Sequence, residues 1–237
     1  MHHVVLERWS RGDSPVHRRD ARAKILLTLA LLVLLSTAQD HLAAVSLLYF
    51  GALVMGLVAA RLPVWGALVR AAVVLPFSAV FGLASWLAGE PERALALAAK
   101  SYLSALGVLL LVASTRMPDL LRAMESLGAP RFLLIVAQFL YRYLFIISEQ
   151  AQHMRSAALS RGGFRRAGFR AAAGALGVLF ARSYARADNI HRAMLARGFH
   201  GHFHMPAAAR FGWADGLFLA AAGGGLALLR LVAGRLG

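Results

Sequence analysis

The sequence predicts an all-α, polytopic membrane protein with about five transmembrane helices and one long basic segment outside the bilayer. Three observations predict this class. Apolar residues fill 59% of the 237 positions and charged residues only 16%, whereas soluble domains average about 25% charged residues. The mean hydropathy is +0.62. The apolar residues also gather in runs close to the roughly 20 residues that a helix needs to cross a bilayer.

The net charge of +15 is concentrated in two parts of the chain. Residues 1–24 hold six basic and three acidic side chains, and residues 115–212 hold fourteen arginines and four acids. Residues 25–114 hold only four basic side chains. This separation is typical of apolar spans whose basic loops stay in the cytoplasm. It argues against a nucleic-acid-binding module, in which clustered basic residues attract phosphate, so the expected surroundings are a lipid bilayer.

The first two apolar runs predict a helical hairpin. The first run covers residues 25–38 and is too short to cross alone, so it has to recruit residues 21–24, with Lys24 reaching out to the membrane surface. The second run covers residues 42–60, and the chain turns at Asp40 between them. Residues 1–24 are interpreted as a cytoplasmic leader and not as a cleaved signal peptide, because acidic residues interrupt them and further spans follow.

Two further spans complete a four-span region at residues 25–115. The third covers residues 69–87, with a kink predicted at Pro76. An acidic turn around Glu90 leads to the fourth, from about residue 94 to residue 115. Basic residues cluster before the first span and after the fourth, which places the N-terminus and residues 116–212 in the cytoplasm.

The last apolar stretch, residues 213–229, predicts a fifth span within a C-terminal segment of residues 213–237. It is rich in glycine and alanine, which let helices pack closely in lipid. A fifth span would put the C-terminus outside. The sequence offers no reason for Arg230 and Arg235 at that end of the chain.

The segment of residues 116–212 is predicted to be helical. A short helix is predicted to begin at Met117-Pro118-Asp119. The missing N–H of proline costs nothing in the first turn, where N–H groups have no partner within the helix, and the aspartate interacts favourably with the helix dipole. A long helix follows over residues 131–161. Its first half is apolar but contains Arg142, which is costly in the centre of a bilayer, so the helix is interpreted as lying at the membrane interface. A sixth span is the alternative. A second long helix is expected over residues 171–196.

Both long helices are predicted to end in the same way. The first closes with Ser160-Arg161-Gly162 and the second with Ala196-Arg197-Gly198. Either triplet alone is explained as a helix cap, because glycine adopts the left-handed conformation at low cost and arginine in a last turn opposes the dipole. The same triplet occurs in the leader at Ser10-Arg11-Gly12, to which no role is given. The pair gains meaning only from its context in one basic segment that follows four spans.

In that context nearly the whole chain resembles the T component of energy-coupling factor (ECF) transporters, of the CbiQ type that takes part in cobalt and nickel uptake. The most specific stretches are residues 116–123, 127–131, 141–143 with Glu149, and 192–199.

The resemblance implies a role as a coupling subunit. In that family each of two short Ala-Arg-Gly-like motifs ends a coupling helix and docks in a groove of one ABC ATPase subunit. By position these motifs are Ser160-Arg161-Gly162, with serine in place of alanine, and Ala196-Arg197-Gly198. The implied partners are CbiO-like ATPase subunits and a CbiM-like substrate-binding membrane subunit, with a small accessory subunit as an option. The implied location is the bacterial inner membrane.

Alternatives to this interpretation remain open at the level of the sequence. The T component could serve a vitamin-type substrate subunit, the chain could be a self-sufficient permease, or it could be a membrane-embedded enzyme that uses Gln138, Arg142 or Lys100. No set of paired carboxylates, phosphate-binding glycine loop or activated nucleophile is evident, so no catalytic residue and no cofactor are expected. Glu149 and Asp188 are expected to pair with nearby arginines.

A metal site in the chain is not favoured. His200, His202 and His204 alternate along the chain and could share one side of an extended segment. A solvated loop after the second long helix explains them as well. In the resembling family the metal site is understood to lie in the separate substrate-binding subunit.

Overall fold

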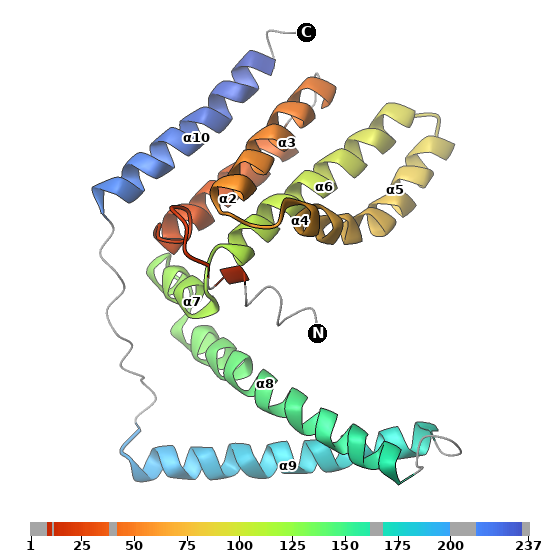
Figure 1. Ribbon diagram of the computed structural model, residues 1–237, viewed down its shortest axis with the longest axis vertical. Helices are drawn as coiled ribbons and strands as arrows, with labels where there is room; N and C mark the ends of the chain where they lie inside the picture. Colours follow the sequence, from red (N-terminus) through yellow and green to blue (C-terminus); the bar gives the residue numbers. More distant parts are fainter. Residues whose placement is uncertain (1–8, 11, 38–41, 162–167, 200–211, 234–237) are drawn as a thin grey trace. The chain divides into compact units, whose positions relative to one another are not determined.

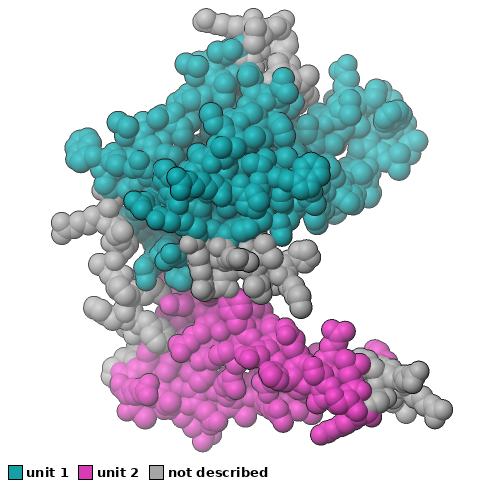
Figure 2. Space-filling view, viewed as in Figure 1, with its two compact units in different colours: residues 1–128, 208–237 teal, residues 129–207 magenta. Residues whose placement is uncertain are grey.

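The computed structural model describes residues 9–10, 12–37, 42–161, 168–199 and 212–233. These residues form helices and no strand, as the sequence predicts. The chain divides into two compact units (Figure 2). Unit 1 comprises residues 1–128 and 208–237, and unit 2 comprises residues 129–207.

Unit 1 contains the predicted apolar helices (Figure 1). They are α2 (Ala21–Ser36), α3 (Leu42–Ala59), α4 (Val64–Ala71), the short 3₁₀ helix η1 (Ala72–Val74), α5 (Leu75–Leu87), α6 (Pro91–Ala113), α7 (Met117–Ser126) and α10 (Trp213–Ala233). Unit 2 consists of α8 (Arg131–Ser160) and α9 (Gly168–Ala196).

Four stretches of the described residues are long and apolar enough to cross a membrane by length and composition. They are Val64–Leu87, Pro91–Ala113, Arg131–Ser160 and Trp213–Val232. Three of them coincide with the predicted third, fourth and fifth spans. The fourth stretch is α8, so its length and composition fit the alternative of an additional span as well as the interfacial placement.

The predicted kink at Pro76 is present. The helix that begins at Val64 changes to a 3₁₀ turn at Ala72–Val74 and resumes as α5 at Leu75. Proline has no backbone N–H, and its ring clashes with the carbonyl four residues earlier, which breaks the regular hydrogen-bond ladder.

The core of unit 1 lies where α2, α3, α4 and α6 meet. Tyr49 and Leu57 of α3 and Leu106 of α6 are its largest fully buried side chains. Glycine allows the helices to approach closely here, since a Cβ atom at Gly107 would lie only 2.6 Å from Leu31 Cδ2 of α2. Small residues at such crossings drive helix association in lipid, where the hydrophobic effect between helices is absent.

The side chain of Lys24 in α2 is buried and does not extend to an exposed surface as predicted. Its side chain is only 5% exposed, and its Nζ atom donates hydrogen bonds to Ser114 O at 2.8 Å, His17 O at 3.3 Å and Thr115 Oγ1 at 3.4 Å. The ammonium thus caps the C-terminal end of α6, where the helix dipole favours a cation. The expected snorkelling is wrong, because the protein itself provides hydrogen-bond acceptors for the ammonium at the end of α6 and in the leader.

The position of Arg230 is explained by α2. The guanidinium of Arg230 in α10 donates to Leu34 O at 2.6 Å, Thr37 Oγ1 at 2.8 Å and Thr37 O at 2.8 Å, all at the end of α2. At the other end of both helices, Asp215 Oδ1 accepts a hydrogen bond from Asp20 N at 3.1 Å. These contacts show that α10 runs parallel to α2, so both helices end on the same side of unit 1. Arg235 lies outside the described residues.

Several helices end in a left-handed residue. Gly89, Gly128 and Gly198 have φ of 84°, 96° and 75°, and Arg61 has φ of 54°. At Arg61 the backbone forms the two hydrogen bonds of a Schellman motif, Arg61 N to Val58 O at 2.9 Å and Leu62 N to Leu57 O at 3.0 Å. Arginine at this position carries the strain of its Cβ, which glycine would avoid.

A cation–π contact ties the leader to α4, and polar contacts join residues within the leader. The guanidinium of Arg70 in α4 stacks on the ring of Trp9 at 4.4 Å. His17 contacts Ser14 Oγ at 2.7 Å and Trp9 O at 3.0 Å through its two ring nitrogens. The Arg18 guanidinium donates to Asp13 and lowers the pKa of that carboxyl.

Candidate functional site

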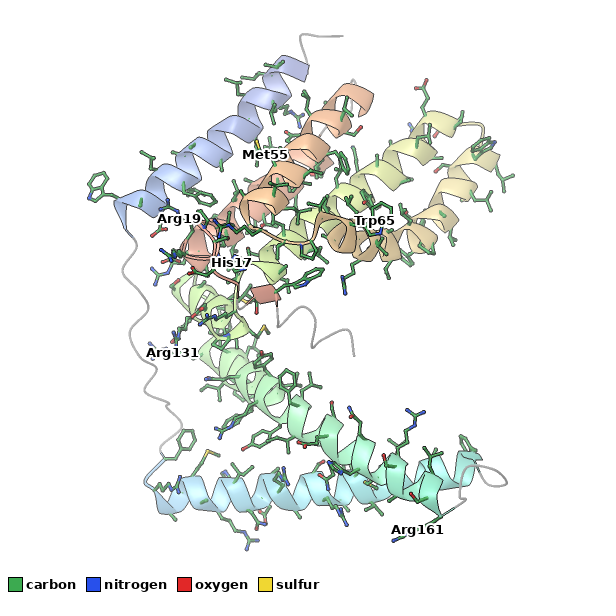
Figure 3. All side chains as sticks on the ribbon, in the orientation of Figure 1. His17, Arg19, Met55, Trp65, Arg131 and Arg161 are labelled. Atoms are coloured by element: carbon green, nitrogen blue, oxygen red, sulfur yellow. The ribbon has the colours of Figure 1, made fainter. Side chains whose placement is uncertain are left out.

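The first candidate motif lies at the end of α8. The helix has 30 residues and ends at Ser160, and Arg161 is its C-cap. Ser160 Oγ donates to Ser156 O at 3.0 Å, so this small side chain is folded back onto its own helix. Arg161 is exposed, and Figure 3 shows it at the tip of α8. Gly162, the third residue of the motif, lies outside the described residues.

The second candidate motif forms a complete helix cap at the end of α9. Gly198 N donates to Leu195 O at 2.9 Å, and Phe199 N donates to Met194 O at 3.0 Å. Together with the positive φ of Gly198, these two bonds define a Schellman motif. The glycine is therefore required by local backbone geometry. The cap leaves Ala196 and Arg197 exposed immediately before the chain turns away.

Capping does not use the two arginine side chains. Arg161 and Arg197 both occupy the C-cap position of a long helix, and neither guanidinium has a hydrogen bond or ion pair with another described residue. A planar guanidinium that is exposed and unpaired can receive a carboxylate through two parallel hydrogen bonds. Both motifs thus present the same group in the same local setting.

The structure does not bring the two arginines into one site. Helices α8 and α9 form a hairpin in which residues 139–150 of α8 face residues 182–194 of α9. The end of α8 is therefore near the start of α9 (Figure 1). Arg197 follows Ala196, the last residue of α9, and so lies at the other end of that helix. Since α9 has 29 residues, its length is about 43 Å. The motifs are suited to two separate contacts.

The hairpin itself has little core. Leu134 is the buried residue of α8, and the two helices meet over a small cavity of about 270 Å³ lined by Phe139, Tyr143, Ile190 and neighbouring residues. Large apolar side chains on both helices face outward instead. The exposed ones include Phe132, Leu133, Leu140, Leu176, Phe180 and Tyr184. Exposed apolar surface of this extent marks contact with a partner or with lipid.

The acidic residues of the hairpin pair locally. Asp188 forms an ion pair with Arg192 at 2.8 Å, as the sequence predicts. Glu149 is different, because its partner is His153 at 3.7 Å and not an arginine. Both pairs join residues four apart on one exposed helix face, where such pairs contribute only about 0.3–0.5 kcal/mol. They are features of the helix surface and not an acid–base pair.

The structure offers no test of the histidine loop and no other candidate metal site among the residues that it describes. His200, His202 and His204 lie outside the described residues. Within the described ranges, no group of three His, Cys, Asp or Glu residues could hold a metal ion.

The contacts that the sequence reasoning missed are the buried and interhelical hydrogen bonds of Lys24, Asp215 and Arg230, which hold unit 1 together. A usable signal was present, because a charged residue within an apolar helix is costly unless it is paired. The identity of the partner could not be read from the sequence, since the contacts join residues 90 to 196 positions apart.

Comparison with known proteins agrees with the geometry. The family model for the cobalt transport protein CbiQ matches residues 12–206. The match includes α2 to α9 with both arginine-bearing helix ends, and it stops before α10. A search of curated proteins finds no match. Since the family model covers well over half of the 237 residues, the chain belongs to the CbiQ family of cobalt transport proteins.

Proposed function

We propose that this chain is the transmembrane coupling subunit, or T component, of an ECF-type ABC importer for cobalt or nickel ions. It links ATPase subunits in the cytoplasm to a separate substrate-binding membrane subunit, and the ATPase subunits hydrolyse ATP. The observation that carries the proposal is a pair of exposed arginines at the C-cap positions of α8 and α9, in a member of a cobalt transport family. Neither arginine side chain has a partner among the described residues.

The placement of the arginines supports two contacts, one for each ATPase subunit. Arg161 and Arg197 stand at opposite ends of α9, at the tips of rigid helices of 30 and 29 residues. The ATPase surface that receives them would offer a carboxylate in a groove. A small residue before each arginine, Ser160 or Ala196, lets the helix end approach that groove closely.

The exposed apolar surface of the hairpin supports a second kind of contact. A long helix moves as a unit, so displacement of its tip shifts the side chains along its length. The apolar residues of α8 and α9, such as Leu140 and Phe180, face outward and would transmit that shift to the substrate-binding subunit. This role places the N-terminus and residues 116–212 in the cytoplasm of a bacterial inner-membrane protein.

The proposal is tested by co-purifying the full chain with its candidate ATPase in detergent. We expect Arg161→Glu or Arg197→Glu to weaken association roughly 30-fold or more each, because reversing one charge of a buried interface pair costs at least about 2 kcal/mol. The double variant should lose the ATPase. Arg161→Lys and Arg197→Lys should weaken association less than the glutamate variants, because lysine keeps the positive charge although it cannot form two parallel hydrogen bonds.

Arg182→Glu provides the matched control. It makes the same change of charge in an exposed part of α9 that lies 15 residues before Arg197, and it should leave association unchanged. Equal association of the double variant and wild type, with the membrane chain still monodisperse, would reduce both motifs to ordinary helix caps and refute the proposal.

Metal uptake distinguishes the proposed role from a self-sufficient permease. In vesicles, the complete set of subunits should accumulate cobalt or nickel when ATP is supplied. The purified chain alone should bind neither ion, and saturable binding by the chain alone would support the permease instead.

A further inference from the structure

An apolar cavity of about 370 Å³ lies within unit 1, between α2, α3, α6 and α10. Its lining is apolar apart from Lys24, Thr28 and Ser114. Met55 of α3 contributes to the wall toward α10 (Figure 3). The space exists because the facing side of α10 carries small side chains, namely Ala221, Ala222 and Gly225.

The cavity runs along α10 for half the thickness of a bilayer. Its lining on α10 begins at Phe218 and ends at Leu229, in the regular spacing of one helix face. Eleven residues of helix correspond to about 16 Å, and the hydrocarbon core of a bilayer is about 30 Å thick. The length of the cavity is therefore close to half of that thickness, which is the depth that one leaflet offers to an acyl chain.

A polar hollow of about 500 Å³ adjoins the cavity at the end where α2 and α10 begin, since residues 20–22 and Asp215 line it. Ser114 lines both spaces. Arg19 lines the hollow and stacks over the ring of Phe218, which lines the cavity, at 5.9 Å. Five arginines, Arg19 among them, and four aspartates line the hollow.

The aspartates of the hollow are already engaged. Asp13 pairs with Arg18 at 2.9 Å and Asp119 pairs with Arg122 at 3.4 Å. Asp20 accepts from the backbone N–H of residue 22 at 2.8 Å, and Asp215 accepts from the backbone N–H of residues 20 and 212 at 3.1 and 3.2 Å.

Three arginines of the hollow have no such partner. Among the described residues, no carboxylate lies within ion-pair distance of Arg19, Arg22 or Arg116. The hollow is thus suited to bind an anion.

We propose that unit 1 binds one anionic phospholipid, with an acyl chain in the apolar cavity and the phosphate at Arg22 and Arg116. An apolar cavity about as long as one leaflet is deep adjoins a hollow whose arginines have no carboxylate partner among the described residues, and this combination has the chemistry of an anionic phospholipid. The acyl chain fills the space that the small side chains of α10 leave open. The phosphate would receive the charge-assisted hydrogen bonds for which Arg22 and Arg116 have no carboxylate among the described residues. This inference does not depend on coupling to an ATPase.

The test measures lipid binding to the purified full chain by native mass spectrometry. The probes are dioleoylphosphatidylglycerol and dioleoylphosphatidylcholine, which share their acyl chains and differ in net charge. Wild type should bind the anionic lipid more tightly. The double variant Arg22→Gln, Arg116→Gln should lose roughly 30-fold in affinity, on the basis of about fivefold for each basic group near a lipid phosphate.

A second variant tests the apolar half of the site. Gly225→Leu fills part of the cavity and should lower the affinity for the anionic lipid roughly 30-fold, which corresponds to excluding two or three methylene groups of the acyl chain from the cavity. Gly224→Leu makes the same substitution one position earlier, where the residue does not line the cavity and an added Cβ meets nothing within 4 Å. It should bind like wild type.

The charge variant also has a control. The double variant Arg155→Gln, Arg182→Gln removes the same number of charges from exposed positions of unit 2 and should leave lipid affinity unchanged.

Three outcomes would overturn the proposal. The first is equal binding of the two lipids by wild type. The second is equal loss of affinity in Gly225→Leu and Gly224→Leu. The third is full competition by glycerol phosphate at the concentration of the lipid, which would show a phosphate site without an acyl-chain site.

Discussion

Replacing Lys24 by methionine tests how the buried polar contacts hold unit 1 together. Methionine keeps the length and volume of the side chain but removes the ammonium that caps α6. The carbonyl oxygens of Ser114 and His17, which accept from Lys24 Nζ at 2.8 and 3.3 Å, lose this donor. A buried group left without its partner costs about 1–3 kcal/mol, so the two acceptors together amount to roughly 2–4 kcal/mol.

Part of this loss is offset, because methionine does not have to be dehydrated as an ammonium does on burial. We therefore expect Lys24→Met to lower the free energy of unfolding by about 2 kcal/mol, which is close to a 30-fold change in the ratio of folded to unfolded protein. The assay is equilibrium unfolding of the purified chain in mixed micelles with increasing SDS, followed by circular dichroism.

The chain offers a matched control, since its only other lysine is Lys100. Lys100 also donates to a carbonyl at a helix end, but through a single 3.4 Å contact with Ser36 O at an exposed position. Lys100→Met should therefore cost less than about 0.5 kcal/mol. If both variants unfold at the same SDS fraction, the contacts of Lys24 do not stabilise unit 1 and the reasoning fails.

Three further predictions concern the helix packing and helix ends of the chain. Arg230→Gln removes the donor at the end of α2 and should release α10, which limited proteolysis would detect as faster cleavage between α9 and α10; unchanged cleavage would contradict this. Gly107→Leu should destabilise unit 1 by at least about 2 kcal/mol through its 2.6 Å approach to α2, whereas Gly51→Leu, with open space around it, should not; equal SDS midpoints would refute the packing argument. Arg61→Gly should stabilise the chain by about 0.5–1 kcal/mol, and Gly198→Ala, at a similar left-handed position, should destabilise it by a similar amount; the same sign for both would contradict the role of positive φ.

Helix positions were largely predictable because their signals are local. The start at Met117 follows from proline and aspartate chemistry, and α7 begins there and ends at Ser126. The long helix predicted over residues 131–161 is α8, Arg131–Ser160. The break near Pro76 follows from the missing N–H of proline. Boundaries differ where no such residue marks them, and α9 begins at Gly168, three residues before the predicted start.

The sequence by itself determined the class of protein and the position of the two motifs. Apolar runs of membrane length, segregated charge and two matching arginine-bearing helix ends are all visible without a structure. The prediction that these ends bind ATPase subunits remains to be tested. The structure adds that both arginines are exposed and have no partner in the part of the chain that it describes, and that a Schellman cap accounts for Gly198.

Only the tertiary structure decided which helix faces which. In a water-soluble protein, the apolar face of a helix marks the side that packs against the core. The helices α2 and α3 are apolar on all sides, because lipid as well as protein surrounds them, so their sequences do not mark the packed side. For that reason the cap that Lys24 places on α6 and the parallel pairing of α10 with α2 through Asp215 and Arg230 appear only when the helices are assembled.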